Sequence, residues 1–366
     1  MLVSSPHSGR AGRLKHLRAT LERLGIAIAA HLQVNDLDHA HPLGTHWREH
    51  GYDLAIAAGG DGTIGSVATH LNGSGIPLGI LPMGTANDVA RSLHLPLDIE
   101  EACAAIAGGI PVDVDVGQVV PGLTEPGAYS AAHHVATHPG ELSPVAGVTF
   151  LHAVTLGLNV EFARLATDAL RRERLGGLTY AASALEAVAH YRPVDVTLRL
   201  IGMEGAEEGT EGEAAENVIR SRVVQISIIN MPVFGGALGV RVPGVGLRDR
   251  QLDFMVIEAG DAQQLRHVVQ QLLDTIGGSA NQTDSAATDE ENGGVRLLPG
   301  VRRFRARAAI LETDDAVDVT LDGEIRTHTP ALVRVAPHRL RVLVPPRAKD
   351  LMMRGNELAE PGTAVD

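Results

Sequence analysis

The stretch that most constrains this chain is residues 54–63, which read Leu-Ala-Ile-Ala-Ala-Gly-Gly-Asp-Gly-Thr. The apolar run is typical of a buried strand, and three glycines among the next four residues force a tight turn whose backbone can approach a ligand closely. Residues 64–71 can continue as a helix, so free N–H groups and the positive end of the helix dipole would face the turn. The pattern predicts a phosphate-binding loop, because a purely structural turn seldom needs three glycines and a carboxylate.

Asp61 within this loop is not expected to touch phosphate, because like charges repel, so we expect it to act through a metal ion or a ligand hydroxyl. The loop also satisfies the dinucleotide-binding pattern G-x-G-x-x-G, from Gly60 to Gly65. A nicotinamide-binding unit should carry an acid at the end of the next strand, about 20 residues further on. Pro82 and Met83 stand there instead. The dehydrogenase hypothesis therefore loses its second support.

The composition of the chain argues against several other classes of protein. Lysine occurs only at Lys15 and Lys349, whereas a P-loop needs Gly-Lys-Ser/Thr and a protein kinase needs a strand lysine after its glycine-rich loop. A formal net charge of -13 argues against general nucleic-acid binding. Cys103 is the single cysteine, so no disulfide framework is expected. The chain begins without a signal-peptide pattern and no run approaches 18 apolar residues, so we expect a cytoplasmic protein, at most peripheral at a membrane surface.

Two domains and a tail are predicted within the 366 residues. Strands alternate with helices over residues 1–115, which predicts an α/β fold with an N-terminal doubly wound parallel sheet that binds nucleotide at the carboxyl ends of its strands. Residues 116–345 are rich in β-type runs and predict a C-terminal antiparallel β-sandwich, interrupted by helices near residues 161–186 and 262–276. Residues 121–144, 204–216 and 277–294 look like loops, and residues 346–366 like a disordered tail.

Two further clusters have simple interpretations. His133, His134 and His138 could bind a metal through their spacing, but no carboxylate or cysteine completes the set, so a solvated loop is favoured. Alternating arginines at 303, 305 and 307, and a helical set at 171, 172 and 174, are most often solvated faces. Contact with anionic lipid headgroups is the more specific hypothesis for both sets.

Six motifs follow one another in a fixed order along the chain. They are Ser-Pro-His-Ser-Gly at residues 5–9, Gly-Gly-Asp-Gly-Thr at 59–63, Pro-Met-Gly-Thr-Ala-Asn-Asp at 82–88, Leu-Gly-Gly-Leu-Thr-Tyr at 175–180, Asn230 with Gly235 and Gly236, and Asp-Gly-Glu at 322–324. This order resembles the diacylglycerol kinase catalytic family, in particular the soluble bacterial lipid kinases, which are similar to sphingosine kinases and more distantly to NAD kinases. The resemblance covers about residues 1–345.

The resemblance implies roles for individual residues. Glu324 is the first choice for the catalytic base, Asp322 the second, and Asp61 completes the catalytic set. Without the resemblance, residues 322–324 would be interpreted as a tight β-turn, since Asp-Gly is a strong hairpin signal. The ATP-binding residues implied are Ser8, Gly59, Gly60, Asp61, Gly62, Thr63, Gly84, Thr85 and Asn87.

A Mg²⁺ site is also implied by resemblance. Asp249 would supply the side-chain ligand, and Gly246 and Gln251 would supply main-chain carbonyls. Arg250 stands where the family usually has glycine, and a cation at this position could substitute for part of the metal's charge. Ser5 likewise replaces an asparagine, and residues 34–38 lack a threonine that usually contacts nucleotide, so the adenosine pocket is not predicted.

These observations predict an ATP- and Mg²⁺-dependent kinase that phosphorylates a lipid hydroxyl, such as that of diacylglycerol. Its expected partners are ATP and a lipid substrate at a membrane surface, without nucleic acid, and a homodimer is possible. Two alternatives stay open: an NAD kinase or other small-molecule kinase, and a nucleotide-binding regulator that has lost catalysis. Which lipid is accepted is not encoded in any linear motif, because acyl chains are recognised by cavity shape.

Overall fold

The computed structural model describes residues 1–5, 11–37, 44–71, 73–122, 134, 147–158, 192–203, 216–234, 240–259, 287–289, 294–298 and 301–357. Several predicted features lie outside these ranges. They are Ser8, the histidines at 133 and 138, the arginines at 171, 172 and 174, the helices near residues 161–186 and 262–276, most of the three predicted loops, and the motifs at 175–180 and 235–236.

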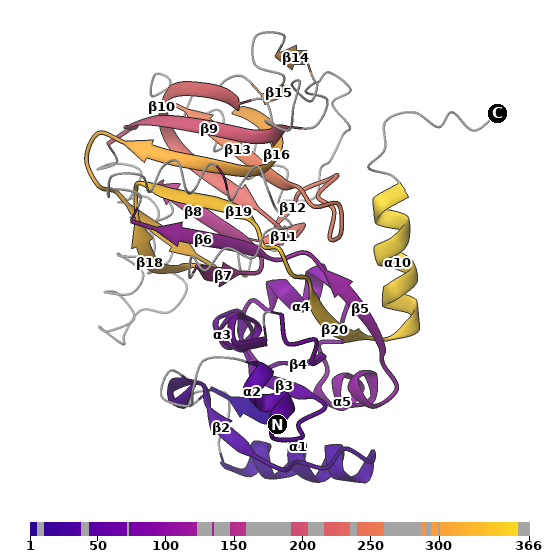
Figure 1. The fold of residues 1–366 in the computed structure, drawn as a ribbon. Coiled ribbons are helices and arrows are strands. Elements are labelled where there is room, and N and C mark those ends of the chain that lie inside the picture. The colour runs from indigo at the N-terminus through magenta and orange to yellow at the C-terminus, as the bar shows by residue number, and fades with distance from the viewer. Residues whose placement is uncertain are drawn as a thin grey trace, which may run out of the picture.

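The first sheet has six strands in the order β2-β1-β3-β4-β20-β5 (Figure 1). Their bounds are Leu2–Ser4 for β1, His31–Gln33 for β2, Ala55–Gly59 for β3, Leu78–Pro82 for β4, Ile110–Val114 for β5 and Leu340–Val344 for β20. Neighbouring strands are parallel except β20 and β5, which are antiparallel. The parallel N-terminal sheet predicted from the sequence is therefore confirmed.

Helices cover both faces of this sheet. On β3, Ile56 and Ala58 pack in one apolar cluster with α1 and α5, whereas Ala55 and Ala57 pack in the opposite cluster with α2, α3, α4 and α10. Side chains alternate between the faces because a strand has a period of two residues. The helices are α1 Ala11–Arg23, α2 Gly44–Glu49, α3 Asp61–Leu71, α4 Asp88–Ser92, α5 Ile99–Ala107 and α10 Pro346–Glu357, with a 3-10 turn η1 at Val34–Asp36.

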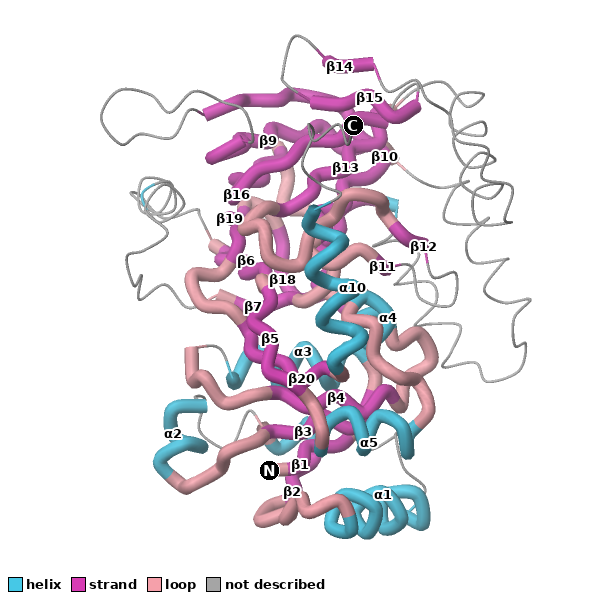
Figure 2. The backbone as a smooth tube through the Cα atoms, turned by 90° about the vertical axis from the view of Figure 1, so that its right-hand side faces the viewer, coloured by secondary structure: helices cyan, strands magenta, loops and turns pink. Residues whose placement is uncertain are grey.

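The second sheet forms an antiparallel, β-rich domain, as predicted (Figure 2). Twelve strands of the described ranges are hydrogen-bonded into it, and Phe150, Phe254 and Phe304 lie in its core. The strands are β6 Gly117–Pro121, β7 Val148–Phe150, β8 Ala153–Gly157, β9 Val194–Met203, β10 Glu216–Ile229, β13 Leu252–Glu258, β14 Ala287–Asp289, β15 Gly294–Leu298, β16 Val301–Thr313, β17 Asp318–Leu321, β18 Glu324–His328 and β19 Ala331–Val335. A separate hairpin consists of β11 Val233–Phe234 and β12 Val240–Arg241.

The C-terminal part of the chain differs from the predicted domain limits. The sequence pattern predicts that residues 340–344 belong to the second domain, but β20 pairs with β4 and β5, so the chain returns to the first sheet. The tail predicted to be disordered from residue 346 begins with helix α10. Ala348 and Met352 of this helix are buried in the first domain's core, and this apolar burial holds the helix in place.

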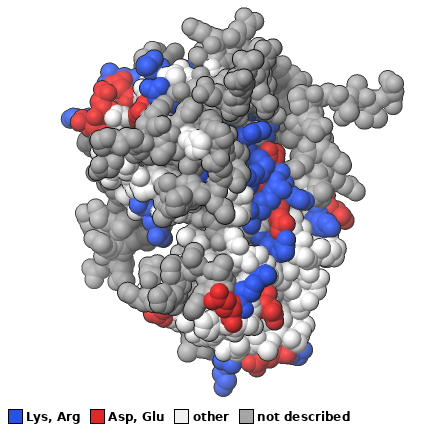
Figure 3. Space-filling view, viewed as in Figure 1, with Lys and Arg blue, Asp and Glu red and all other residues white. Residues whose placement is uncertain are grey.

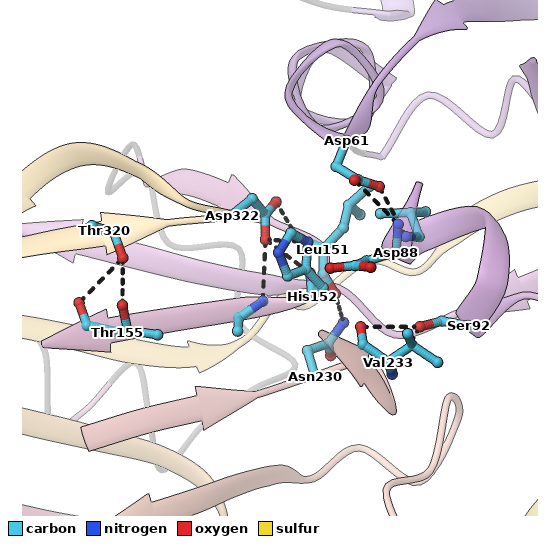
Figure 4. Close-up of polar contacts among 12 residues, drawn as sticks. Asp61, Asp88, Ser92, Leu151, His152, Thr155, Asn230, Val233, Thr320 and Asp322 are labelled. Atoms are coloured by element: carbon cyan, nitrogen blue, oxygen red, sulfur yellow. Dashed lines mark hydrogen bonds and ion pairs between the residues drawn. The ribbon is translucent and has the colours of Figure 1, made fainter. Parts of the chain in front are cut away.

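The two domains pack directly against each other. Leu151, Met231 and Leu247 of the second domain belong to the apolar cluster of the first. The Val233 N–H donates a hydrogen bond of 3.1 Å to the Ser92 hydroxyl, which connects β11 to the end of α4 (Figure 4). None of the described helices combines the length and apolarity that a bilayer span requires.

Candidate active site

Two glycine-containing loops meet at the carboxyl edge of the first sheet. β3 and β4 are adjacent parallel strands, so the loops that follow them are neighbours, and the Met83 N–H donates to the Gly59 carbonyl at 2.9 Å. A Cβ built on Gly84 would lie 2.5 Å from Cα of Gly60, which is closer than two carbons can approach. Glycine at 84 therefore lets the predicted phosphate loop and the second loop touch, backbone against backbone.

The side chain of Asp61 holds the two glycine loops against each other. Its carboxylate accepts hydrogen bonds from the N–H groups of Asp88, at 3.1 Å, and Val89, at 2.9 Å, at the start of α4 (Figure 4). Carboxylates stabilise helix N-termini in this way. Both oxygens of Asp61 thus hold the second loop, and its catalytic role stays a prediction.

Asn87 shapes the second loop from within. It has a left-handed backbone with φ of 55°, which asparagine tolerates better than most residues. Its Oδ1 accepts the Gly84 N–H at 2.9 Å, and its Nδ2 donates to the Gly84 carbonyl at 3.0 Å. Thr85 between them is exposed, whereas Thr63 is buried against Gly59. Of these residues, Thr85 presents its side chain to solvent at the mouth of the loops.

The Asp-Gly-Glu segment forms a two-residue hairpin between β17 and β18. Asp322 and Gly323 both have positive φ, 49° and 89°, as a type I′ turn requires. The motif can therefore be both a tight β-turn and part of a functional site, because the hairpin places its two acids at the boundary between the domains.

The hairpin lies directly against α3. A Cβ built on Gly62 would lie 3.1 Å from Oε1 of Glu324, and one built on Gly65 would lie 3.3 Å from Oδ2 of Asp322. Residues three apart share one face of a helix, so the two glycines form a flat strip on which the acids rest. The structure thus brings the Asp-Gly-Glu motif at residues 322–324 next to the Gly-Gly-Asp-Gly-Thr motif at residues 59–63, although the two are far apart in the sequence.

The two acids of the hairpin have different surroundings. Asp322 is only 9% exposed and accepts the N–H groups of Leu151, His152 and Ala153 at 2.8, 2.9 and 3.1 Å, while His152 Nδ1 lies 3.2 Å from Oδ1 (Figure 4). Glu324 is 57% exposed, and one of its oxygens accepts a hydrogen bond of 2.5 Å from Arg326. Asp322 anchors the turn, and Glu324 is the acid of the pair that is open to solvent.

A cavity of about 250 Å³ opens beside these acids, between the domains. One wall is the face of α3 that carries Gly62, Gly65, Ser66, Thr69 and His70, and the other consists of residues 147–149, 321, 322, 324 and 326. The ring of His70 stacks on Trp47 with a centroid distance of 6.1 Å, and its Nδ1 lies 2.8 Å from the Ser66 carbonyl.

The polar residues of this wall are not among those predicted from the sequence. The signal was present, because positions 62, 65, 66, 69 and 70 follow the helical i, i+3, i+4, i+7, i+8 pattern. Thr149 and Arg326 carried no such signal, since only the pairing of distant strands brings them to the cavity.

The predicted Mg²⁺ site is filled by protein groups. Asp249 accepts the Gln251 N–H at 3.1 Å and a guanidinium hydrogen bond from Arg305. Its carboxylate also packs so tightly on Gly246 that no Cβ would fit there. Burial raises the pKa of Asp249 against the opposing effects of the Gln251 N–H and Arg305. Within the described ranges, no group of three His, Cys, Asp or Glu side chains is placed to hold a metal.

The residues present therefore do not fit a Mg²⁺ ion at Asp249. The positive charge of Arg305 already occupies one carboxylate oxygen, and a hard cation prefers several oxygen ligands. Of the alternating arginines, Arg307 is exposed, as a solvated face requires, whereas Arg303 donates to the buried carboxylate of Asp253 at 2.7 Å and Arg305 donates to Asp249. Burial raises the pKa of Asp253 to about 6, although Arg303 and Arg305 act to lower it.

The fold and site together define a class: an α/β domain with a parallel sheet, whose glycine loops face a carboxylate supplied by an antiparallel β-rich domain. Residues 1–119 match the profile of the diacylglycerol kinase catalytic domain. This part of the chain is therefore similar to the catalytic domain of diacylglycerol kinases.

Similarity to individual proteins agrees with this assignment. The chain is 38% identical over 126 residues to the diacylglycerol kinase of Bacillus subtilis (strain 168), covering 32% of this chain and 41% of that protein. It is 47% identical over 76 residues to the diacylglycerol kinase of Staphylococcus saprophyticus, covering 19% and 24%. The matches thus span less than half of either relative.

Similarity of fold extends over nearly the whole chain. A crystal structure described as a diacylglycerol kinase from Bacillus anthracis str. Sterne superposes with a TM-score of 0.57 at 17% identity, covering 95% of this chain and 97% of the other. This likeness establishes the two-domain fold.

Proposed function

We propose that the protein is an ATP-dependent lipid kinase, which transfers the γ-phosphoryl group of ATP to a hydroxyl group of a lipid such as diacylglycerol. The observation that carries the proposal is the contact between Glu324 of the second domain and Gly62 of the phosphate loop. A candidate base thereby lies next to the backbone predicted to hold the transferred group.

ATP would bind over the two glycine loops. The first-turn N–H groups of α3 lack intrahelical acceptors, and the positive end of the helix dipole favours phosphate there. Because Asp61 directs its carboxylate at α4, its negative charge is drawn away from this position. Thr85 and the backbone of residues 60–63 are the proposed phosphate contacts, and the Mg²⁺ that accompanies ATP would neutralise phosphate charge.

The acceptor would enter the cavity between the domains. Its hydroxyl proton passes to a Glu324 oxygen as the hydroxyl oxygen bonds to the γ-phosphorus, and the bond from that phosphorus to the bridging oxygen of ADP breaks. Ser66, Thr69 and His70 line the cavity, which suits the polar end of a lipid, with the acyl chains remaining at the membrane surface.

Asp322 is proposed as a positioning residue. Its two oxygens already accept three backbone N–H groups, so they are engaged by the turn rather than open to a substrate hydroxyl. Its hydrogen bonds to residues 151–153 fix the hairpin and thereby the direction of Glu324. Asp61 has the corresponding role on the ATP side, since it fixes the second loop against the first.

The test is transfer of radiolabelled phosphate from ATP. The full chain would be incubated with detergent-dispersed diacylglycerol, with a panel of other hydroxyl-bearing lipids and, separately, with NAD. We expect label in a lipid product, with the Glu324→Gln variant as the matched control, slowed by about 10²–10⁴-fold as for loss of a general base.

Two results would contradict the proposal. Label in NAD and in no lipid would identify a small-molecule kinase. ATP binding without transfer to any acceptor would identify a nucleotide-binding regulator. Equal lipid turnover by the wild type and the Glu324→Gln variant would leave the reaction standing but remove Glu324 as its base.

A further inference from the structure

The chain crosses between the two domains at two places that lie together. One crossing is Asp115, between β5 and β6, and the other is residues 336–339, between β19 and β20. The Ala336 N–H donates to the Val116 carbonyl at 2.8 Å, and the Asp115 N–H donates to the Leu247 carbonyl at 2.8 Å. The loop of residues 246–251 contacts the first crossing through Leu247 and the second through the side chain of Arg250, which donates to the Ala336 carbonyl. We call these three segments the junction.

A buried negative charge lies at the centre of the junction. The side chain of Asp115 is 1% exposed. Its Oδ2 accepts the Arg250 backbone N–H at 2.7 Å, and its Oδ1 accepts Nε of Arg339 at 2.7 Å, with Nη1 of Arg250 at 3.7 Å. A buried carboxylate must be compensated by charge and hydrogen bonds, and two arginines do this here.

The same guanidinium groups bind the carbonyl oxygens around Asp115. Arg250 donates to the carbonyls of Ala336, at 2.9 Å, and Pro337, at 3.4 Å, while Arg339 donates to the carbonyl of Arg248 at 2.9 Å. Carboxylate and carbonyl oxygens in one place are what a divalent cation would use. In this chain they already accept hydrogen bonds from arginine.

Arg250 has a backbone conformation that is more usual for glycine. Its φ is 60°, in the left-handed region that disfavours residues with a Cβ and favours glycine. Glycine would relieve this backbone conformation but would leave the carboxylate of Asp115 without one of its cations.

Figure 3 shows basic and acidic surface side by side in a band on this face, reaching the level at which the domains meet.

We propose that arginine replaces a structural divalent cation in this chain. Arg250 and Arg339 at Asp115, with Arg305 at Asp249, lock the three segments of the junction, so the relative position of the two domains does not depend on a metal. The proposal concerns the architecture and is independent of the reaction catalysed. Any Mg²⁺ requirement of turnover then belongs to the ATP that the enzyme uses.

The experiment is thermal unfolding of the full chain without nucleotide, in EDTA and in excess MgCl₂. The wild type is expected to have the same Tm in both. The Arg250→Gly variant is expected to have a lower Tm in EDTA and to regain stability in MgCl₂, because removing the guanidinium opens a place for the cation among the same oxygens. Titration calorimetry with MgCl₂ alone should then detect binding by the variant and none by the wild type.

Arg341→Ala is the matched control, since this arginine pairs with the exposed carboxylate of Asp113 and its loss should not create any response to Mg²⁺. A wild-type Tm that falls in EDTA or rises in MgCl₂ overturns the proposal without reference to any variant. An Arg250→Gly Tm equal to that of the wild type in EDTA overturns it as well. A variant that is destabilised and gains nothing from MgCl₂ overturns the idea that guanidinium and metal are interchangeable here.

Discussion

The two acids of the hairpin should separate into a stability role and a rate role. Asp322→Asn is expected to destabilise the protein with a secondary effect on turnover, and Glu324→Gln to abolish most turnover at wild-type stability. The reason is that Asp322 is buried and fully hydrogen-bonded, whereas Glu324 is more than half exposed.

The magnitude follows from the hydrogen bonds of Asp322. Oδ1 accepts the N–H groups of His152 and Ala153, and Oδ2 accepts that of Leu151. In the Asp322→Asn variant, the amide oxygen can still accept the N–H groups of His152 and Ala153. The NH₂ group then faces the Leu151 N–H and cannot accept it. One buried donor loses its partner, which costs about 1–3 kcal/mol. At about 2–4 °C per kcal/mol for a domain of roughly 150–250 residues, Tm should fall by about 2–12 °C.

Glu324→Gln leaves the size of the side chain unchanged and alters an exposed position, for which about 0.5 kcal/mol in either direction is usual. Scanning calorimetry of both variants and the radiolabel assay on the folded protein are the two measurements. Equal losses of Tm in the two variants would refute the division of roles. So would an Asp322→Asn enzyme that keeps its Tm but loses turnover as completely as Glu324→Gln.

Two other substitutions test the packing of the first domain. Gly84→Ala places a methyl group against Cα of Gly60 and Oδ1 of Asn87, so overpacking should lower the free energy of unfolding by about 1–3 kcal/mol. The same change should raise KM for ATP more than it lowers kcat. Denaturant unfolding and nucleotide-dependent kinetics check the two effects, and an unchanged KM would contradict the contact between the loops. Asp98→Ala removes the side chain that accepts the N–H groups of Glu100 and Glu101 at the start of α5. The free energy of unfolding should fall by about 1 kcal/mol, and turnover should not change. A loss of activity would mean that α5 influences the site.

Much of the fold was readable from local pattern. The alternation of apolar strands and helices gave the parallel first sheet, because periodicity and turn residues act over a few positions. The runs of β-type residues gave the antiparallel second domain. The return of residues 340–344 to the first sheet was missed, since a strand's pattern does not state which neighbour it will pair with. Helix α10 was missed because its buried residues, Ala348 and Met352, are few.

The sequence by itself determined the parts of the site that depend on backbone conformation: the glycine turn after β3, the second glycine loop, and the Asp-Gly hairpin. Each is set by short-range steric rules that hold wherever the segment is placed. Only the tertiary structure decided that Gly62 faces Glu324, that Asp61 caps α4, and that arginine side chains fill the predicted metal position. These contacts join segments far apart in the chain, and their partners are chosen by packing and by the need to compensate buried charge, which no local pattern encodes.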